Sequence, residues 1–190
     1  MFALPAVVLA ASALLAPPPD PMTIDVLSAT GTGCDANTSA VGMSIDNTAF
    51  TVVFSNFAVL GHGQEAKKDC TITLRVNHPD GFTFGIAQVD YRGFAHLESG
   101  AHGFQDSTYH FTGLPTRHSK QKYDGPMDGD WQVTDQPEAG AVLHGPCKEH
   151  RPLTITTELK VNGKSDGSFM TMDSADSNIS EKFILTWTKC

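Results

Sequence analysis

The stretch FTFGIAQVDYRGFAHLE, residues 82–98, decides the fold class of this chain. It begins with Phe82, Phe84 and Ile86 at every second position, a period that is typical of a half-buried β-strand. It continues into DYRG at 90–93, where a carboxylate, a phenol and a guanidinium stand beside a glycine. The stretch therefore predicts a strand that carries a polar candidate site.

Short runs with the same alternation occur on both sides of this stretch. The expected strands cover residues 22–28, 41–45, 50–55, 71–77, 108–112, 131–134, 153–161, 169–172 and 183–188. Turn residues separate these runs, and no window has sustained helical periodicity. The sequence therefore predicts an all-β protein with little helix, an antiparallel β-sandwich that is jelly-roll-like or barrel-like.

The N-terminus predicts secretion. Residues 1–16 contain a short apolar run with an Ala11-Ser12-Ala13 cleavage pattern, which indicates a secretory signal peptide. Residues 17–21 form a proline-rich spacer, and we expect residues 22–190 to be a single β-sandwich domain. We therefore predict an extracellular location.

The charge of the chain argues against two classes of partner, although solubility alone explains it equally well. The formal net charge is −8 and the sequence pI is about 5.3. A nucleic-acid-binding protein needs a basic face, and anionic membranes attract basic segments. We therefore expect neither nucleic acid nor membrane as a partner.

The four cysteines predict two disulfides, because an even number of cysteines in an oxidising compartment is usually paired. Of the three connectivities, we favour Cys34–Cys70 with Cys147–Cys190. Asn37 and Asn178 begin Asn-x-Ser/Thr sequons and are predicted glycosylation sites in a eukaryotic source.

Two stretches supply candidate binding residues. In a strand, Asp90 and Arg92 point to one face and Tyr91 to the other, which suits either a polar binding site or a structural ion pair. Residues 113–130 read as a long polar loop, and such loops often carry function. Its candidate binding residues are Arg117, Lys120, Lys122 and Tyr123.

The sequence assigns no catalytic, metal-binding or cofactor residues. The pattern Gly-x-Ser-x-Gly is absent, and the eight histidines lack the spacing of a metal site. Acidic clusters at 124–130 and 173–178 are expected to be solvated turns. A carboxylate pair for glycoside hydrolysis could form from separate strands, with Asp90 and Glu98 as the candidates.

Several blocks together resemble one family. They are DYRG at 90–93, Tyr-x-Phe-x-Gly at 109–113, Trp131, the block 147–161 and SFMTMDS at 168–174. In these blocks the chain is similar to the secreted domain-of-unknown-function family 4360 of fungi and actinomycetes, over about residues 22–190. Lys148 departs from the glycine expected after the third cysteine. The resemblance implies a small secreted protein with paired cysteines, and it transfers no catalytic residues.

These observations favour a secreted, non-enzymatic binding protein with an extracellular protein as its partner. An effector that binds or inhibits a host protein such as a protease is the sharpest form of this hypothesis. The alternatives are a hydrolase acting on cell-wall polysaccharide and a metal-binding envelope protein. A glycan partner is also compatible with the sequence.

Overall fold

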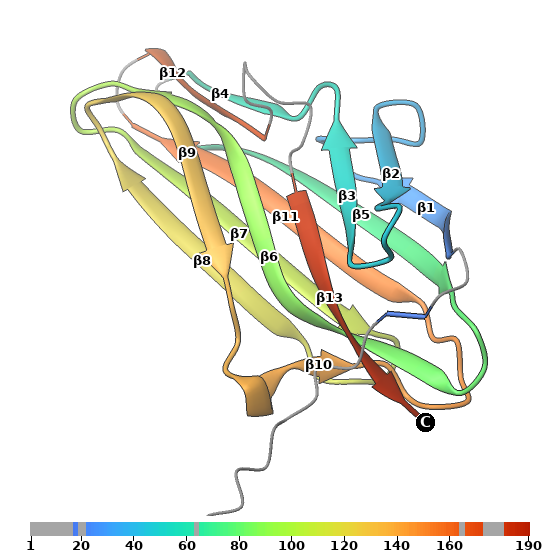
Figure 1. Ribbon diagram of the computed structural model, residues 1–190. Helices are drawn as coiled ribbons and strands as arrows, with labels where there is room; N and C mark the ends of the chain where they lie inside the picture. The colour runs from blue at the N-terminus through green and yellow to red at the C-terminus, as the bar shows by residue number, and fades with distance from the viewer. Residues whose placement is uncertain (1–16, 19–21, 63–64, 164–165, 173–180) are drawn as a thin grey trace, which may run out of the picture.

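The computed structural model describes residues 17–18, 22–62, 65–163, 166–172 and 181–190, and most of them lie in β-strands. The strands form two antiparallel sheets that face each other (Figure 1). The helical structure in this part of the chain is the short 3-10 turn η1 (Ala139–Ala141), and no helix there could span a membrane. The prediction of an antiparallel β-sandwich is confirmed, whereas residues 1–16 and 19–21 lie outside the described residues.

The smaller sheet has five strands. Their order is β1 (Thr23–Thr30), β5 (Ala66–Asn77), β11 (Leu153–Asn162), β7 (His102–Phe111) and β8 (Arg117–Asp124). Buried and half-buried residues alternate strictly along β7 and β11. One face of this sheet therefore packs on the core, and the other faces solvent.

The larger sheet has eight strands. Its main path runs through β2 (Ser39–Met43), β3 (Ala49–Phe54), β13 (Glu181–Lys189), β6 (Phe82–Leu97), β12 (Asp166–Thr171) and β4 (Ala58–His62). Strands β9 (Met127–Asp135) and β10 (Leu143–His144) also pair with β6. Strand β6 is thus the strand with the most partners.

A one-residue bulge in β6 changes which residues face the core. Leu185 pairs with Ile86 and the preceding Ile184 pairs with Gln88, so Ala87 is left as an extra residue. Because side chains alternate along a strand, this extra residue exchanges the two faces. Phe84 and Ile86 are buried before the bulge, and Val89 and Tyr91 are buried after it.

Large apolar side chains from both sheets fill the space between them. The largest fully buried ones are Tyr91, Tyr109, Phe50, Phe54, Phe57, Phe111, Phe183, Ile72, Leu74, Ile86, Leu97 and Leu153. Phe50 and Phe183 stack at 4.6 Å between ring centroids, and Tyr109 of the opposite sheet meets Phe183 edge-on at 6.1 Å. Aromatic contacts of this kind connect the two layers.

Two disulfides hold the ends of the sandwich. Cys34 is joined to Cys70 and Cys147 to Cys190, with Cα–Cα distances of 5.3 and 5.7 Å. These separations are normal for a disulfide. The favoured connectivity agrees with this pairing.

The prediction of a loop at residues 113–130 is wrong. Most of it forms β8 and the first part of β9, which pair with β7 and β6 respectively. Polar residues occupy both faces of β8 because it is the outermost strand of its sheet. The alternation by which other strands were recognised is therefore missing here, and the segment does not protrude as a loop.

A row of polar side chains runs through the core between the sheets. Gln105 donates to Ser107 at 2.7 Å, Ser107 donates to Thr157 at 3.0 Å, and Thr157 donates to the Oε1 atom of Glu181 at 2.5 Å. All four residues are buried. The Oε2 atom of Glu181 has no hydrogen-bond partner among the described residues, so this carboxyl group is only half satisfied.

Burial makes the ionised form of Glu181 unfavourable. Desolvation raises the pKa of Glu181 from 4.5 to about 7, although the hydrogen bond from Thr157 acts in the opposite direction. The folded state therefore holds the proton more tightly than the unfolded state does. The stability that the protonated Glu181 contributes is complete below about pH 4.5 and is lost as the pH rises toward about 7.

We expect Glu181→Gln to remove this pH dependence. Each pKa unit corresponds to about 1.4 kcal/mol, so the wild-type protein should lose on the order of 3 kcal/mol of unfolding free energy between about pH 4.5 and 7. Urea unfolding at several pH values measures the effect. Glu138→Gln, a change at an exposed carboxylate, is the control. The same pH slope in Glu181→Gln and wild type would contradict this assignment.

Candidate functional site

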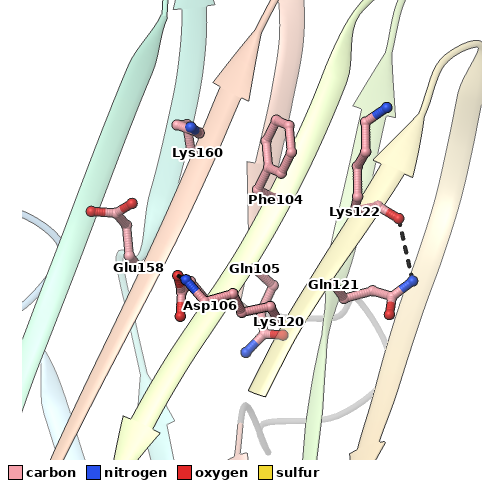
Figure 2. Close-up of a pocket in the computed structure, with 8 residues that line it drawn as sticks. All are labelled: Phe104, Gln105, Asp106, Lys120, Gln121, Lys122, Glu158 and Lys160. Carbon is pink, nitrogen blue, oxygen red and sulfur yellow. Dashed lines mark hydrogen bonds and ion pairs between the residues drawn. The ribbon is translucent and has the colours of Figure 1, made fainter. Parts of the chain in front are cut away.

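A groove of about 320 Å³ lies on the solvent face of the five-stranded sheet. It crosses β11, β7 and β8, as Figure 2 shows. The lining residues are Phe104, Gln105, Asp106, Lys120, Gln121, Lys122, Glu158 and Lys160. This groove is the best candidate for a binding site in the described structure.

The register of the three strands brings six of the eight lining residues together in two rows. Gln105 and Gln121 lie opposite each other between these rows, and Gln105 is buried. Phe104 lies opposite Lys160 on one side and opposite Lys122 on the other. Two residues further along β7, Asp106 lies between Glu158 and Lys120. Side chains that are directly opposite one another on one face are close enough to interact.

The charged groups of the groove are paired with one another or with neighbouring residues. The ion pairs are Lys120–Asp106 at 2.5 Å, Lys122–Asp124 at 2.6 Å, Lys67–Glu158 at 3.1 Å and Lys160–Glu65 at 3.5 Å. A hydrogen bond and the charge of Asp106 raise the pKa of Lys120, which keeps this ammonium group charged. The surface thus offers donors and acceptors of both signs without a large excess of either.

Phe104 supplies an apolar surface in the middle of these charges. The Lys160 Nζ atom lies 4.7 Å from the centroid of the Phe104 ring, a cation–π contact that holds the ring in place. The ring is half-buried, so part of it remains open to a ligand. A rigid ring among fixed polar groups can bind a ligand that has both an apolar face and hydroxyl groups.

The structure places only two of the predicted binding residues in this groove, Lys120 and Lys122. Arg117 instead donates to both carboxylate oxygens of Asp135, at 2.8 and 3.2 Å. Tyr123 is half-buried, with its ring 5.6 Å from that of Trp131. Arg117 and Tyr123 therefore contact other residues of the fold and do not line the groove.

The DYR residues lie on the other sheet and do not form one site. Tyr91 is fully buried in the core. Asp90 accepts hydrogen bonds from Thr134 at 2.7 Å and from Gln88 at 2.9 Å. Arg92 lies opposite Gln132 on the solvent face. The expected Asp90–Arg92 ion pair is absent from the ion pairs of the described residues.

Asp90 and Glu98 cannot act as a catalytic pair. They are eight residues apart along and just beyond β6, and a strand rises about 3.3 Å per residue, so about 26 Å separates them. Glycoside hydrolysis requires carboxyl groups about 5–9.5 Å apart. This candidate assignment is wrong because the two residues follow one extended strand.

The remaining predictions concern glycosylation sites, acidic clusters and metal binding. Asn37 is exposed, whereas Asn178 and the acidic cluster at 173–178 lie outside the described residues, so glycosylation stays a prediction. Asp124 and Asp128 each contact a histidine, His102 at 2.5 Å and His96 at 3.1 Å. Within the described ranges, no group of three or more potential metal ligands is found.

The sequence reasoning missed Phe104, Asp106, Glu158 and Lys160. A usable signal existed, because Phe104-x-Asp106 and Glu158-x-Lys160 occupy the outward positions of alternating strands. The missing information was the pairing of β7 with β11, since 52 residues separate Asp106 from Glu158 in sequence.

Gly93 of the DYRG quartet has a packing role. A Cβ atom at this position would lie 1.9 Å from the Thr171 carbonyl oxygen and 2.5 Å from the Trp131 ring. Two neighbouring strands therefore approach β6 closely at Gly93, and only a residue without a side chain fits there.

We expect Gly93→Ala to destabilise the fold by roughly 1–3 kcal/mol, because the added methyl group must displace backbone on β12 and the ring of Trp131. Chemical unfolding measures the loss. Gly129→Ala on the adjacent β9 is a matched control, because no atom lies within 4 Å of its added Cβ. Equal stability of the two variants would contradict this role of Gly93.

Comparison with solved structures finds matches of low similarity. TmCBM61 in complex with beta-1,4-galactotriose matches with a TM-score of 0.33 and 11% identity, covering 90% of this chain and 89% of that one. The enzymatically active domain of tailspike protein 4 from bacteriophage CBA120 matches with a TM-score of 0.27 and 13% identity, over 89% of this chain and 19% of that one. At these scores the similarity says nothing about a ligand of this protein.

Comparison by sequence is more informative. An "Uncharacterized secreted protein" of Arthroderma benhamiae is 30% identical over 181 residues, which cover 90% of this chain and 74% of the relative. The predicted extracellular location agrees with this relative, and the protein is secreted. The model of the family described as "Domain of unknown function (DUF4360)" matches residues 20–190. The chain belongs to the DUF4360 family.

Proposed function

We propose that this protein is a secreted, non-enzymatic carbohydrate-binding protein whose sheet groove holds a segment of an uncharged polysaccharide. The observation that carries the proposal is the half-exposed Phe104 ring, which stands among ion-paired side chains in the groove. Three properties of the groove support this class of ligand.

The first property is its position. The groove crosses three paired strands of the sheet (Figure 2), and the backbone hydrogen bonds between these strands hold its lining residues. A shallow groove on a sheet suits one stretch of a long chain better than a small molecule that must be enclosed. Rigid lining residues also lose little conformational entropy on binding.

The second property is the cancellation of charge. Asp106 and Glu158 are each ion-paired to a lysine. Lys122 and Lys160 are likewise ion-paired, to Asp124 and Glu65. A charged ligand would have to break one of these pairs, whereas hydroxyl groups can hydrogen-bond to paired ions without separating them. A polyhydroxylated neutral chain is therefore the best match.

The third property is the aromatic ring. One side of a sugar ring carries C–H groups, which pack favourably on the electron-rich face of an aromatic ring. Phe104 is the aromatic residue that lines the groove, and its outward orientation follows from the alternation along β7. Binding without catalysis is supported by the same ion pairs, because neither carboxyl group is free to act as a general acid.

A protein partner is the second candidate, and the same face favours it. Lys120 and Lys122 are exposed and lie on an edge strand, where they could meet acidic residues of an extracellular protein. Residues 117–124 are a paired strand, so an effector or protease inhibitor could not insert them into an enzyme cleft as a free loop.

We expect Phe104→Ala to weaken binding of the mature, oxidised protein to a neutral polysaccharide about tenfold, the equivalent of about 1.4 kcal/mol for a lost ring contact. Isothermal titration calorimetry against soluble glucans, galactans, xylans and mannans measures the affinity. Phe94→Ala is the matched control, since Phe94 is also half-buried but lies on the solvent face of the other sheet.

Each outcome decides between the candidates. Binding to at least one glycan that Phe104→Ala weakens and Phe94→Ala preserves supports the proposal. Equal loss in both variants, or no binding to any glycan, overturns it. Capture of a protein partner from extracellular fluid that Lys120→Glu abolishes would favour the second candidate.

A further inference from the structure

A second hollow, of about 280 Å³, lies at one end of the sandwich and is separate from the groove. The turn between β5 and β6 forms one wall, and the segment between β10 and β11 forms the other. The residues that line it are His78, Asp80, Gly81, Phe82, Lys148 and His150. Nothing in the proposed carbohydrate groove uses these residues.

Two stacked imidazole rings form the core of this hollow. The ring centroids of His78 and His150 are 4.3 Å apart, and their planes differ by 12°. The edge of His78 is also supported by Phe84 and Trp187, at 5.9 and 6.2 Å between centroids. His78 is therefore positioned by the aromatic core, and His150 stacks on it.

The walls of the hollow are tied together. The disulfide Cys147–Cys190 joins the segment that carries His150 to the end of β13. The backbone N–H of Cys190 donates to the Gly81 carbonyl oxygen at 2.7 Å, which connects β13 to the turn of the opposite wall. Lys148 directly follows Cys147 of the disulfide. It has a positive φ of 69°, so the backbone turns sharply at this residue.

The remaining charges around the hollow nearly cancel. Among its lining residues, Asp80 is negative and Lys148 is positive. Glu149 and Arg151, which flank His150, form their own ion pair at 2.6 Å. Lys189 lies opposite Phe82 at the rim and adds a positive charge. The net charge of the hollow therefore depends mainly on the protonation of the two histidines.

We propose that this hollow is an oxyanion-binding site that operates in acidic surroundings, with a carboxylate or sulfate group held by His78, His150 and Lys148. In neutral surroundings the imidazoles are mostly uncharged and stack favourably, and the site has little attraction for an anion. In acid, two cationic rings at 4.3 Å repel each other, and an anion relieves that repulsion. Uronic-acid-bearing and sulfated glycans both carry such groups.

The groups around His78 shift its pKa in opposite directions. Burial lowers the pKa of His78, and the nearby His150 lowers it further, whereas Asp80 raises it. The Nε2 atom of His150 lies 3.9 Å from the Asp80 carboxylate. Anion binding and protonation of the site must strengthen each other, so affinity for the anion rises as the pH falls.

The test is an NMR titration of the mature, oxidised protein with sodium glucuronate, with sodium sulfate and with uncharged glucose, at about pH 5 and about pH 7.5. Glucuronate and sulfate both keep their charge over this range, so any pH dependence comes from the protein. We expect shifts of the His78 and His150 ring signals with either anion, an affinity at least about tenfold higher in acid, and no response to glucose.

Variants locate the site. His150→Gln should weaken anion binding about tenfold in acid and reduce its pH dependence, because His78 remains, and Lys148→Gln should weaken binding at both pH values. His62→Gln, at an exposed histidine of β4, is the matched control, and Phe104→Ala should leave anion binding unchanged. A response to glucuronate alone identifies a carboxylate site, and a response to sulfate alone a sulfate site. Binding of neither anion, equal binding at both pH values, or binding unaffected by His150→Gln and Lys148→Gln overturns the proposal.

Discussion

The backbone of β6 must find hydrogen-bond partners along both edges, and this requirement organises the larger sheet. One edge is shared between β13 at residues 82–91 and β12 at residues 94–96, and the other between β10 at residues 85–86 and β9 at residues 89–97. A buried strand cannot leave such groups unpaired, so four segments from distant parts of the chain must meet on one strand. The first half of β9 comes from the polar stretch that reads as a loop in the sequence.

The same central strand explains the packing role of part of the polar DYRG motif. The bulge at Ala87 turns Tyr91 into the core and Asp90 outward, and the close approach of β9 and β12 requires glycine at position 93. DYRG therefore serves the packing of three strands. The core also contains the buried row that ends at Glu181, in which a half-satisfied carboxyl group connects stability to pH.

The two proposed binding sites lie on surfaces that the paired strands hold in place. In the groove, cross-strand ion pairs surround one aromatic ring, and in the hollow at the end of the sandwich, core aromatics and a disulfide position two imidazoles. The two sites differ in charge chemistry: one is neutralised by its own ion pairs, and the other takes its charge from histidines. A protein with both could bind the neutral backbone and the acidic substituents of one glycan, each under its own conditions.

The sequence by itself determined the all-β class, most strand positions, the secreted location and the family, because alternation, turn residues and signal segments are local patterns. It also supported the disulfide pairing that the structure has. Only the tertiary structure decided that 117–124 is an edge strand, that Ala87 reverses the faces of β6, and that Phe104 stands between Lys160 and Lys122. The physical reason is that strand register is set by hydrogen bonds between residues far apart in sequence, and a shift of one residue exchanges the core and solvent faces.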